Sequence, residues 1–300
     1  MSWVEKLQQK NNVIPGKKDE EEISEEELEE IPKKEPMYAL MHTIDKAKAY
    51  CKENRQDWVF FVTGTEGSGK STLASHVCRR FDNDFTIDES MIYSFREDPH
   101  SFLGFMRKFK DTPFKVAWYD EAVTVLFSHR HCTKDSADAQ EIFKIKRDCR
   151  HFDILVSPSF WDVVPDIRER RTKSLLYCFT EVYHPTDNRT RYRHKYAYFS
   201  GSKIIKLSEN NKAKLAFRSY KELFKIVKPD FIEEFPDMDE KFKTEYMAAK
   251  RANRNAVLDR IEGIQQEEGT EKLLMPNTFG LTELKTELYK LNPEAFKEGV

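Results

Sequence analysis

A glycine-rich segment carries the clearest chemistry in this sequence. It fits the pattern G-x-x-x-x-G-K-S/T, in which glycines let backbone N–H groups turn inward onto phosphate oxygens. The pattern predicts that Lys70 reaches the β- and γ-phosphates of a nucleotide and that the hydroxyl of Ser71 binds Mg²⁺. The residues predicted to contact the phosphates are Gly64, Thr65, Glu66, Gly67, Ser68, Gly69, Lys70, Ser71 and Thr72.

The residues on either side of this segment supply the context that a phosphate-binding loop requires. Residues 58–62 form a short apolar run, typical of a strand buried on both faces, and residues 72–80 are expected to be helical. The N-terminus of that helix would add a partial positive charge next to the phosphates. A strand, a glycine-rich loop and a helix in this order indicate a P-loop rather than an ordinary turn.

Two adjacent acids form a second candidate site. Asp120 and Glu121 follow the apolar run 116–119, so Asp120 is expected at the carboxyl end of a strand, where open α/β sheets bind their ligands. Asp120 would hold Mg²⁺ directly or through water, and Glu121 would orient the attacking water or accept its proton. Nucleotide kinases usually place no such glutamate there, and the guanine-recognition motif N-K-x-D is absent. The pair therefore favours ATP hydrolysis.

The remaining pattern predicts the elements that position these residues. We expect a mainly parallel α/β sheet flanked by helices, with an antiparallel hairpin at its edge and a helical C-terminal region. The domains are predicted as an acidic flexible leader (1–36), a P-loop domain with a β-extension (37–207) and a helical region (208–300). Predicted helices cover 38–54, 101–109, 138–150, 219–227, 242–261 and 281–291. Predicted strands cover 91–94, 115–120, 153–159, 174–183 and 190–199.

Composition limits the class of protein. The chain has 300 residues, 34% of them charged, and a net charge of −2, as in a charged globular protein. Five cysteines without a C-x-x-C motif indicate a reducing compartment and no disulfide framework. No apolar run reaches transmembrane length and the N-terminus lacks signal-peptide order, so a cytoplasmic location is expected. The acidic leader is either a solvated arm or a binding segment for a protein partner.

The motifs together resemble one family. The P-loop, the sequence Tyr119-Asp120-Glu121-Ala122, the pair Arg150-His151 before a buried strand and the pair Ile167-Arg168 after it are similar to those of the HerA–FtsK group of ring-forming P-loop ATPases. The similarity is greatest to the zonula-occludens-toxin-like branch of viruses, phages and mobile elements. It implies a P-loop NTPase fold of the RecA-like (ASCE) type, with ATP and Mg²⁺ bound, and a homo-oligomeric ring that translocates or packages DNA.

The resemblance also implies roles for residues outside the two motifs. A ring ATPase takes a cation from the neighbouring subunit to stabilise the transferring phosphoryl group, and Arg168, then Arg170, are the candidates. Such ATPases carry a polar sensor, commonly Gln, where the fourth strand ends. Here that strand ends at Ser157 and Ser159, and either serine could take the role.

Basic residues on one predicted strand are the candidate DNA contacts. Arg189, Arg191, Arg193 and Lys195 share one face, and Tyr192 and Tyr196 could stack on bases. The same pattern also suits an edge strand protected by charge. Two other functions stay open: an ATPase that acts on protein during assembly or secretion, and a nucleotide-dependent switch without motor activity.

Overall fold

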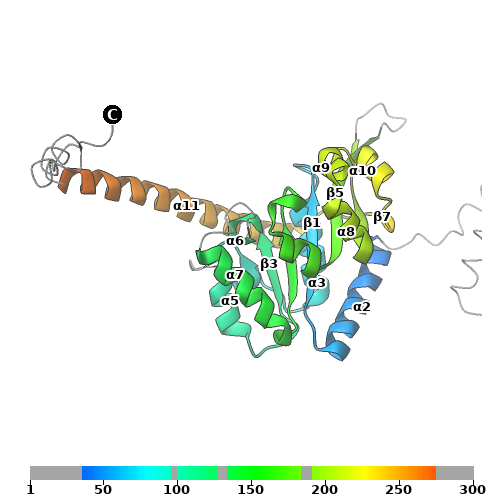
Figure 1. Cartoon of the computed structure of the whole chain (residues 1–300), viewed down its shortest axis with the longest axis horizontal. Coiled ribbons are helices and arrows are strands. Elements are labelled where there is room, and N and C mark those ends of the chain that lie inside the picture. Colours follow the sequence, from blue (N-terminus) through cyan, green and yellow to red (C-terminus); the bar gives the residue numbers. More distant parts are fainter. Residues whose placement is uncertain (1–35, 96–99, 127–133, 184–190, 275–300) are drawn as a thin grey trace, which may run out of the picture.

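The computed structural model describes residues 36–95, 100–126, 134–183 and 191–274. The predicted leader up to residue 35, the hairpin turn at 184–188, Arg189 and the predicted helix 281–291 lie outside these residues. Within the described part of the chain, the strands form one sheet in the order β2-β3-β4-β1-β5-β6-β7 (Figure 1). The strands are β1 (Trp58–Gly64), β2 (Met91–Ile92), β3 (Val116–Asp120), β4 (Phe152–Val156), β5 (Thr172–Tyr183), β6 (Arg191–Ser200) and β7 (Phe231–Glu234).

The strand directions confirm the predicted sheet. β2, β3, β4, β1 and β5 pair in parallel, whereas β5–β6 and β6–β7 pair in antiparallel fashion. β4 lies between β1 and β3, and Val156 at its end is the partner of both Val62 and Asp120. The carboxyl ends of these three strands therefore meet at one edge, which brings the P-loop and the acidic pair together.

Helices cover both faces of the sheet. Along β1, Val59 and Phe61 enter one hydrophobic core and Phe60 and Val62 enter the other, as alternation along a strand requires. The first core also takes residues from α5 (Phe102–Phe109), α6 (Val123–Leu126), α7 (Lys134–Ile145), α8 (Gly201–Glu209), α9 (Asn211–Ala216) and α10 (Tyr220–Ile226). The second takes residues from α2 (Tyr38–Asn54), α3 (Lys70–Phe81), α4 (Ile87–Ser90) and the start of α11 (Glu240–Leu274).

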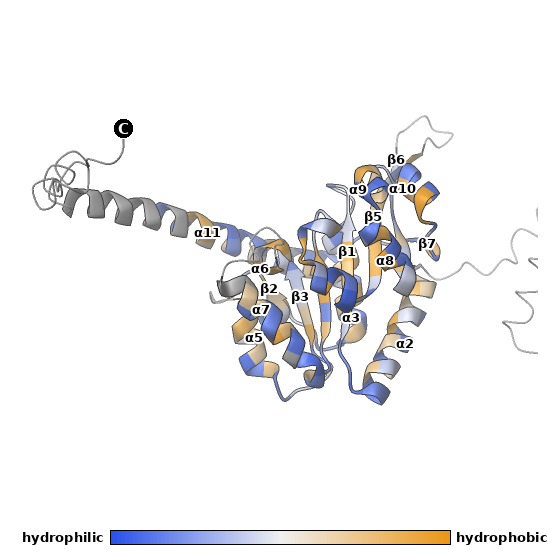
Figure 2. Cartoon of the chain, in the orientation of Figure 1, coloured by the Kyte–Doolittle hydropathy of each residue, from blue (hydrophilic) through white to orange (hydrophobic). Residues whose placement is uncertain are grey.

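The helix sequences show why they pack as they do. In α2, the buried residues are Leu40, Ile44, Ala47 and Cys51, which recur every three to four positions on one stripe. In Figure 2, hydrophobic and hydrophilic colours alternate along α2, as expected for a helix with one buried stripe. Short helical turns η2 (Lys146–Cys149), η3 (Phe160–Asp162) and η4 (Asp166–Arg171) connect the strands on the first face.

The residues from 208 to about 234 pack on the sheet and add a strand to it. β7 lies inside the segment that the sequence analysis placed between two helices, and it pairs with β6. Phe217 and Leu223, from the α9–α10 region, are buried in the same core as β1. β7 has only four residues and lies between Pro229 and Pro236, so its pattern resembles that of a loop.

The C-terminal helix α11 is longer than the predicted 242–261. It has 35 residues, packs on the sheet through its first turns and then extends away from the body of the molecule (Figure 1). None of the helices in the described ranges combines the length and apolar character needed to cross a membrane.

Candidate nucleotide-binding site

The glycine-rich loop joins β1 to α3, as the motif predicts. Gly64 has φ +135°, and a Cβ built there would lie 2.0 Å from the carbonyl oxygen of Cys178 on β5. Gly69 precedes α3 with φ +84°, and a Cβ there would meet the ring of Phe235 at 2.9 Å. The loop can follow this path only with glycine at both positions. Within the loop, the buried hydroxyl of Ser68 donates to the carbonyl of Thr65 at 2.6 Å.

Lys70 folds back over the start of the loop. Its Nζ donates to the carbonyl oxygens of Thr65 at 2.8 Å and Gly64 at 3.2 Å. Burial lowers the pKa of Lys70, and the nearby carboxylates of Glu121 and Glu66 act in the opposite direction. The ammonium group is therefore held at the loop and within electrostatic reach of Glu121. Thr72 follows in the first turn of α3 and is half-buried.

Ser71 and Asp120 meet across the sheet edge. The hydroxyl of Ser71 donates to Oδ1 of Asp120 at 3.1 Å, although 49 positions separate them in the sequence. Asp120 ends β3 and is 2% exposed, so its carboxylate is fixed by the strand. The structure thus brings together the two residues predicted to hold the metal.

The oxygens of this pair suit Mg²⁺. Hydroxyl and carboxylate oxygens are the hard ligands that this ion prefers, and Mg²⁺ usually takes one or two protein ligands, with water and phosphate completing its shell. Among the described residues, no group of three or more His, Cys, Asp or Glu side chains could form an all-protein metal site. A metal bound mainly through a nucleotide is the arrangement that fits Ser71 and Asp120.

Glu121 adopts a left-handed backbone conformation that residues other than glycine rarely adopt. Its φ is +72°, while the following residue, Ala122, donates its N–H to the carbonyl of Val156 at 2.7 Å. The left-handed residue turns the chain out of β3 and leaves the Glu121 side chain exposed at the sheet edge. Such a conformation costs about 1–3 kcal/mol and is concentrated at functional sites. The placement suits a carboxylate that must reach solvent next to a bound nucleotide.

Two residues of α11 contact Asp120, and neither was predicted from the sequence. The hydroxyl of Tyr246 donates to Oδ2 of Asp120 at 2.9 Å, and Nζ of Lys250 lies 3.5 Å from the same oxygen. Lys250 also donates to the Tyr246 hydroxyl at 3.1 Å. Because these residues come from a helix more than 120 positions away, no local pattern in the sequence indicates the contact.

The serines after β4 have different environments. Ser157 is fully buried, and its hydroxyl donates to the carbonyl of Ser159 at 2.8 Å. Ser159 instead lines a cavity of about 660 Å³ beside the loop residues Gly64, Thr65 and Glu66. Of the two predicted sensors, Ser159 is thus the one that borders open space next to the P-loop.

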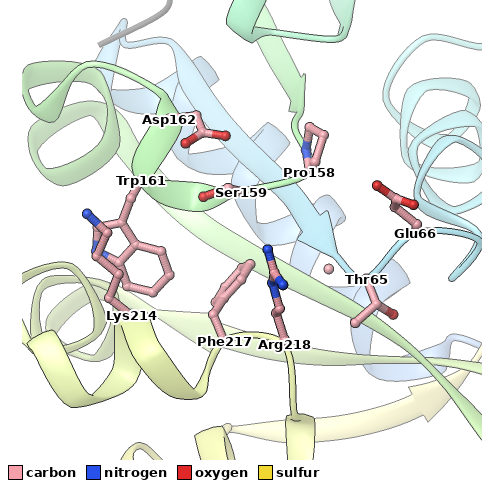
Figure 3. Close-up of a pocket in the computed structure, with 10 residues that line it drawn as sticks. Thr65, Glu66, Pro158, Ser159, Trp161, Asp162, Lys214, Phe217 and Arg218 are labelled. Carbon is pink, nitrogen blue, oxygen red and sulfur yellow. The ribbon is translucent and has the colours of Figure 1, made fainter. Parts of the chain in front are cut away.

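Cationic side chains from the α9 region line the far wall of this cavity. Figure 3 shows Lys214 and Arg218 with Trp161 and Phe217 around the space, facing Ser159 and Thr65. Lys214 and Arg218 are both exposed. Neither Lys214 nor Arg218 was predicted at the nucleotide site, because the packing of α9 onto the sheet was not predicted from the sequence.

The two candidate arginines differ in accessibility. Arg168 is 9% exposed and donates to Ser208 Oγ at 2.8 Å, to Glu169 Oε1 at 2.7 Å and to the carbonyl of Trp161 at 3.2 Å. Its guanidinium group is committed to contacts within its own chain. Arg170 has an 82% exposed side chain and, among the described residues, makes a long ion pair with Asp166 at 3.4 Å. Arg170 is therefore the one whose guanidinium group is accessible from outside the chain.

The basic strand β6 is partly neutralised by acids on neighbouring strands. Lys195 pairs with Glu181 on β5, and Arg193 lies 3.4 Å from Glu234 on β7. Tyr192 is 65% exposed, but Tyr196 is fully buried and its hydroxyl donates to Glu233. The prediction that Tyr196 stacks on bases is wrong, because β7 and the helices cover its face of the sheet.

Comparison with known proteins finds similarity to solved structures but to no family model and no curated protein. The N-terminal domain of zonular occludens toxin from Neisseria meningitidis has 12% identity and a TM-score of 0.37 over 62% of this chain and 97% of that domain.

Two further similar structures are ATPases or NTPases. The genome packaging NTPase B204 of Sulfolobus turreted icosahedral virus 2 has 13% identity and a TM-score of 0.33 over 62% of this chain and 99% of that one. The Legionella pneumophila ATPase DotB has 12% identity and a TM-score of 0.31 over 70% and 66%. The assignment of this chain to the P-loop NTPase fold class rests on its own strand order and on the loop between β1 and α3.

Proposed function

We propose that this chain is a Mg²⁺-dependent ATPase that works as a homo-oligomeric ring to translocate or package DNA. The contact between Ser71 and Asp120, beside a P-loop that holds Lys70, is the observation that carries the hydrolytic part of the proposal. It supports the proposal because the glycine-rich loop and the carboxylate of Asp120 lie at one sheet edge, with Glu121 directly after Asp120.

Each residue has a defined task in this mechanism. Backbone N–H groups of residues 65–72 and the Lys70 ammonium bind the phosphates, while Ser71 and Asp120 hold the metal. When bound, Mg²⁺ would neutralise part of the negative charge of the phosphates. Glu121 accepts the proton of the attacking water, and Ser159 borders the space beside the loop where a γ-phosphate would be sensed. Arg170 of a neighbouring subunit is the candidate cation for the transition state.

The catalytic part is tested by replacing one acid. Glu121→Gln keeps the size and polarity of the side chain but cannot accept a proton, so turnover should fall at least about 100-fold while nucleotide affinity stays within about twofold. Glu53→Gln is the control, because Glu53 is an exposed acid at the end of α2, ahead of the amino end of β1. Normal ATP turnover by the Glu121 variant would remove this residue from its proposed role.

The substrate part is tested by adding DNA. ATPase turnover should rise with duplex DNA. This stimulation should weaken steeply with added salt if the exposed basic side chains of β6 contact DNA phosphates. The ion pairs of Lys195 and Arg193 with Glu181 and Glu234 instead favour a second candidate, an ATPase that acts on protein. Turnover unaffected by DNA at any salt concentration, but raised by a protein partner, would select that alternative.

A further inference from the structure

The first turns of α11 pack against β3, the strand that ends at Asp120. Phe242, Tyr246 and Lys250 are spaced by four positions and therefore form one row along the helix. The rings of Phe242 and Tyr246 stack on Trp118 of β3, with centroid distances of 6.5 and 5.4 Å and interplanar angles of 11° and 9°. Asp120 lies two positions after Trp118 and so points to the same face of the sheet. The apolar stacking thus fixes α11 where the next residues in the row reach Asp120.

The two oxygens of the Asp120 carboxylate have different partners. Oδ2 accepts a hydrogen bond from the Tyr246 hydroxyl and lies near Nζ of Lys250, whereas Oδ1 accepts from Ser71. Tyr246 is 6% exposed, so its hydroxyl is held in place by packing. Lys250 has a 44% exposed side chain and can move into solvent at small cost. The two residues therefore differ in how firmly they are attached to Asp120.

We propose that Tyr246 is a positioning residue of the nucleotide site and that Lys250 is a tethered cation which competes with the divalent metal for Asp120. This inference rests on the proposed function. Tyr246 holds Oδ2, so that Oδ1 stays directed toward Ser71, the other residue proposed to hold the metal. An ammonium group 3.5 Å from the same carboxylate repels a divalent cation placed there, so Lys250 must move outward when the metal–nucleotide complex binds.

The proposal predicts opposite shifts for two variants in one assay. Binding of a fluorescent ATP analogue is measured against Mg²⁺ concentration, which reports metal affinity without turnover. Tyr246→Phe keeps the ring stacked on Trp118 but removes the hydroxyl, and the Mg²⁺ midpoint should rise about 10-fold. Lys250→Gln removes the competing charge, and the midpoint should fall by about 2- to 10-fold. Lys250→Arg keeps the charge, and its midpoint should stay near that of the unchanged protein.

Lys243→Gln is the matched control. Lys243 lies on the same helix, has a 54% exposed side chain and pairs with Glu240 rather than Asp120, so its Mg²⁺ midpoint should not move. If the unchanged protein binds no nucleotide, the proposed function fails and this inference fails with it. If it binds nucleotide and both the Tyr246 and Lys250 variants keep the wild-type midpoint, the ATPase proposal survives and this inference is overturned.

Discussion

Gly64 offers the most direct test of how the P-loop is built into the sheet. Gly64 is paired with Cys178 of β5, and a Cβ added to it would lie 2.0 Å from the carbonyl oxygen, 2.8 Å from the carbonyl carbon and 2.9 Å from the nitrogen of Cys178. Both strands are internal to the sheet, so neither can move aside without breaking its other ladder. The φ of +135° adds strain for any residue with a side chain.

The expected cost of Gly64→Ala follows from these two terms. Strain of about 1–3 kcal/mol and overpacking of about 1–3 kcal/mol give a loss of roughly 4 kcal/mol in the free energy of unfolding. Gly67→Ala is the matched control, because Gly67 also has a positive φ, +69°, but has no atom within 4 Å of an added Cβ. That change should cost about 1–2 kcal/mol from strain alone.

Urea unfolding of the two variants measures both costs. The midpoint of Gly64→Ala should fall far more than that of Gly67→Ala, and its thermal midpoint should fall by roughly 10 °C. Equal losses of stability in the two variants would refute the claim that the β1–β5 contact, rather than the loop's backbone conformation, requires glycine at position 64.

Two further predictions concern the remaining buried groups. Arg168→Ala should lower the free energy of unfolding by about 2–4 kcal/mol, because it removes the donor to Ser208 Oγ and to the buried carbonyl of Trp161 and leaves Glu169 with its hydrogen bond from Ser208. Arg170→Ala should instead change the free energy of unfolding by less than about 0.5 kcal/mol and reduce turnover. The opposite pattern in urea unfolding and ATPase assays would reverse the two roles. Burial lowers the pKa of His151 from 6.5 to about 4, so the unfolded chain binds the extra proton between these values. The contribution of His151 to stability should be constant above pH 6.5 and should fall by about 3 kcal/mol as the pH drops to 4. In urea unfolding at each pH, His151→Gln should remove this part of the slope and leave the part due to His76 and His100, whose pKa values burial also lowers, whereas His42→Gln should leave the whole slope.

The sequence predicted the parts of the fold that local patterns encode. The helix at 38–54 was correct at both ends, and the hairpin of β5 and β6 was predicted within two residues, because amphipathic and alternating patterns there extend over ten or more positions. The contact of Ser71 with Asp120 followed from a general rule, since adjacent parallel strands place their carboxyl ends at one edge.

The parts that the sequence did not predict depend on long-range packing. β7 has four residues, and its position beside β6 is decided by the partner strand rather than by its own pattern. Tyr246 and Lys250 reach Asp120 because Trp118 stacks on α11, a contact between distant segments that no spacing rule reveals. The burial of Arg168 is of the same kind, since Ser208 of α8 is its partner.

The length of α11 gives the contact at Asp120 a mechanical consequence. From Tyr246 to the end of the helix at Leu274, a rise of 1.5 Å per residue makes an arm of about 40 Å. A tilt of about 10° at the base would carry the far end through roughly 7 Å. A change in the angle of α11 at Asp120 would therefore produce a displacement at the far end of the helix that is much larger than the change at the carboxylate itself.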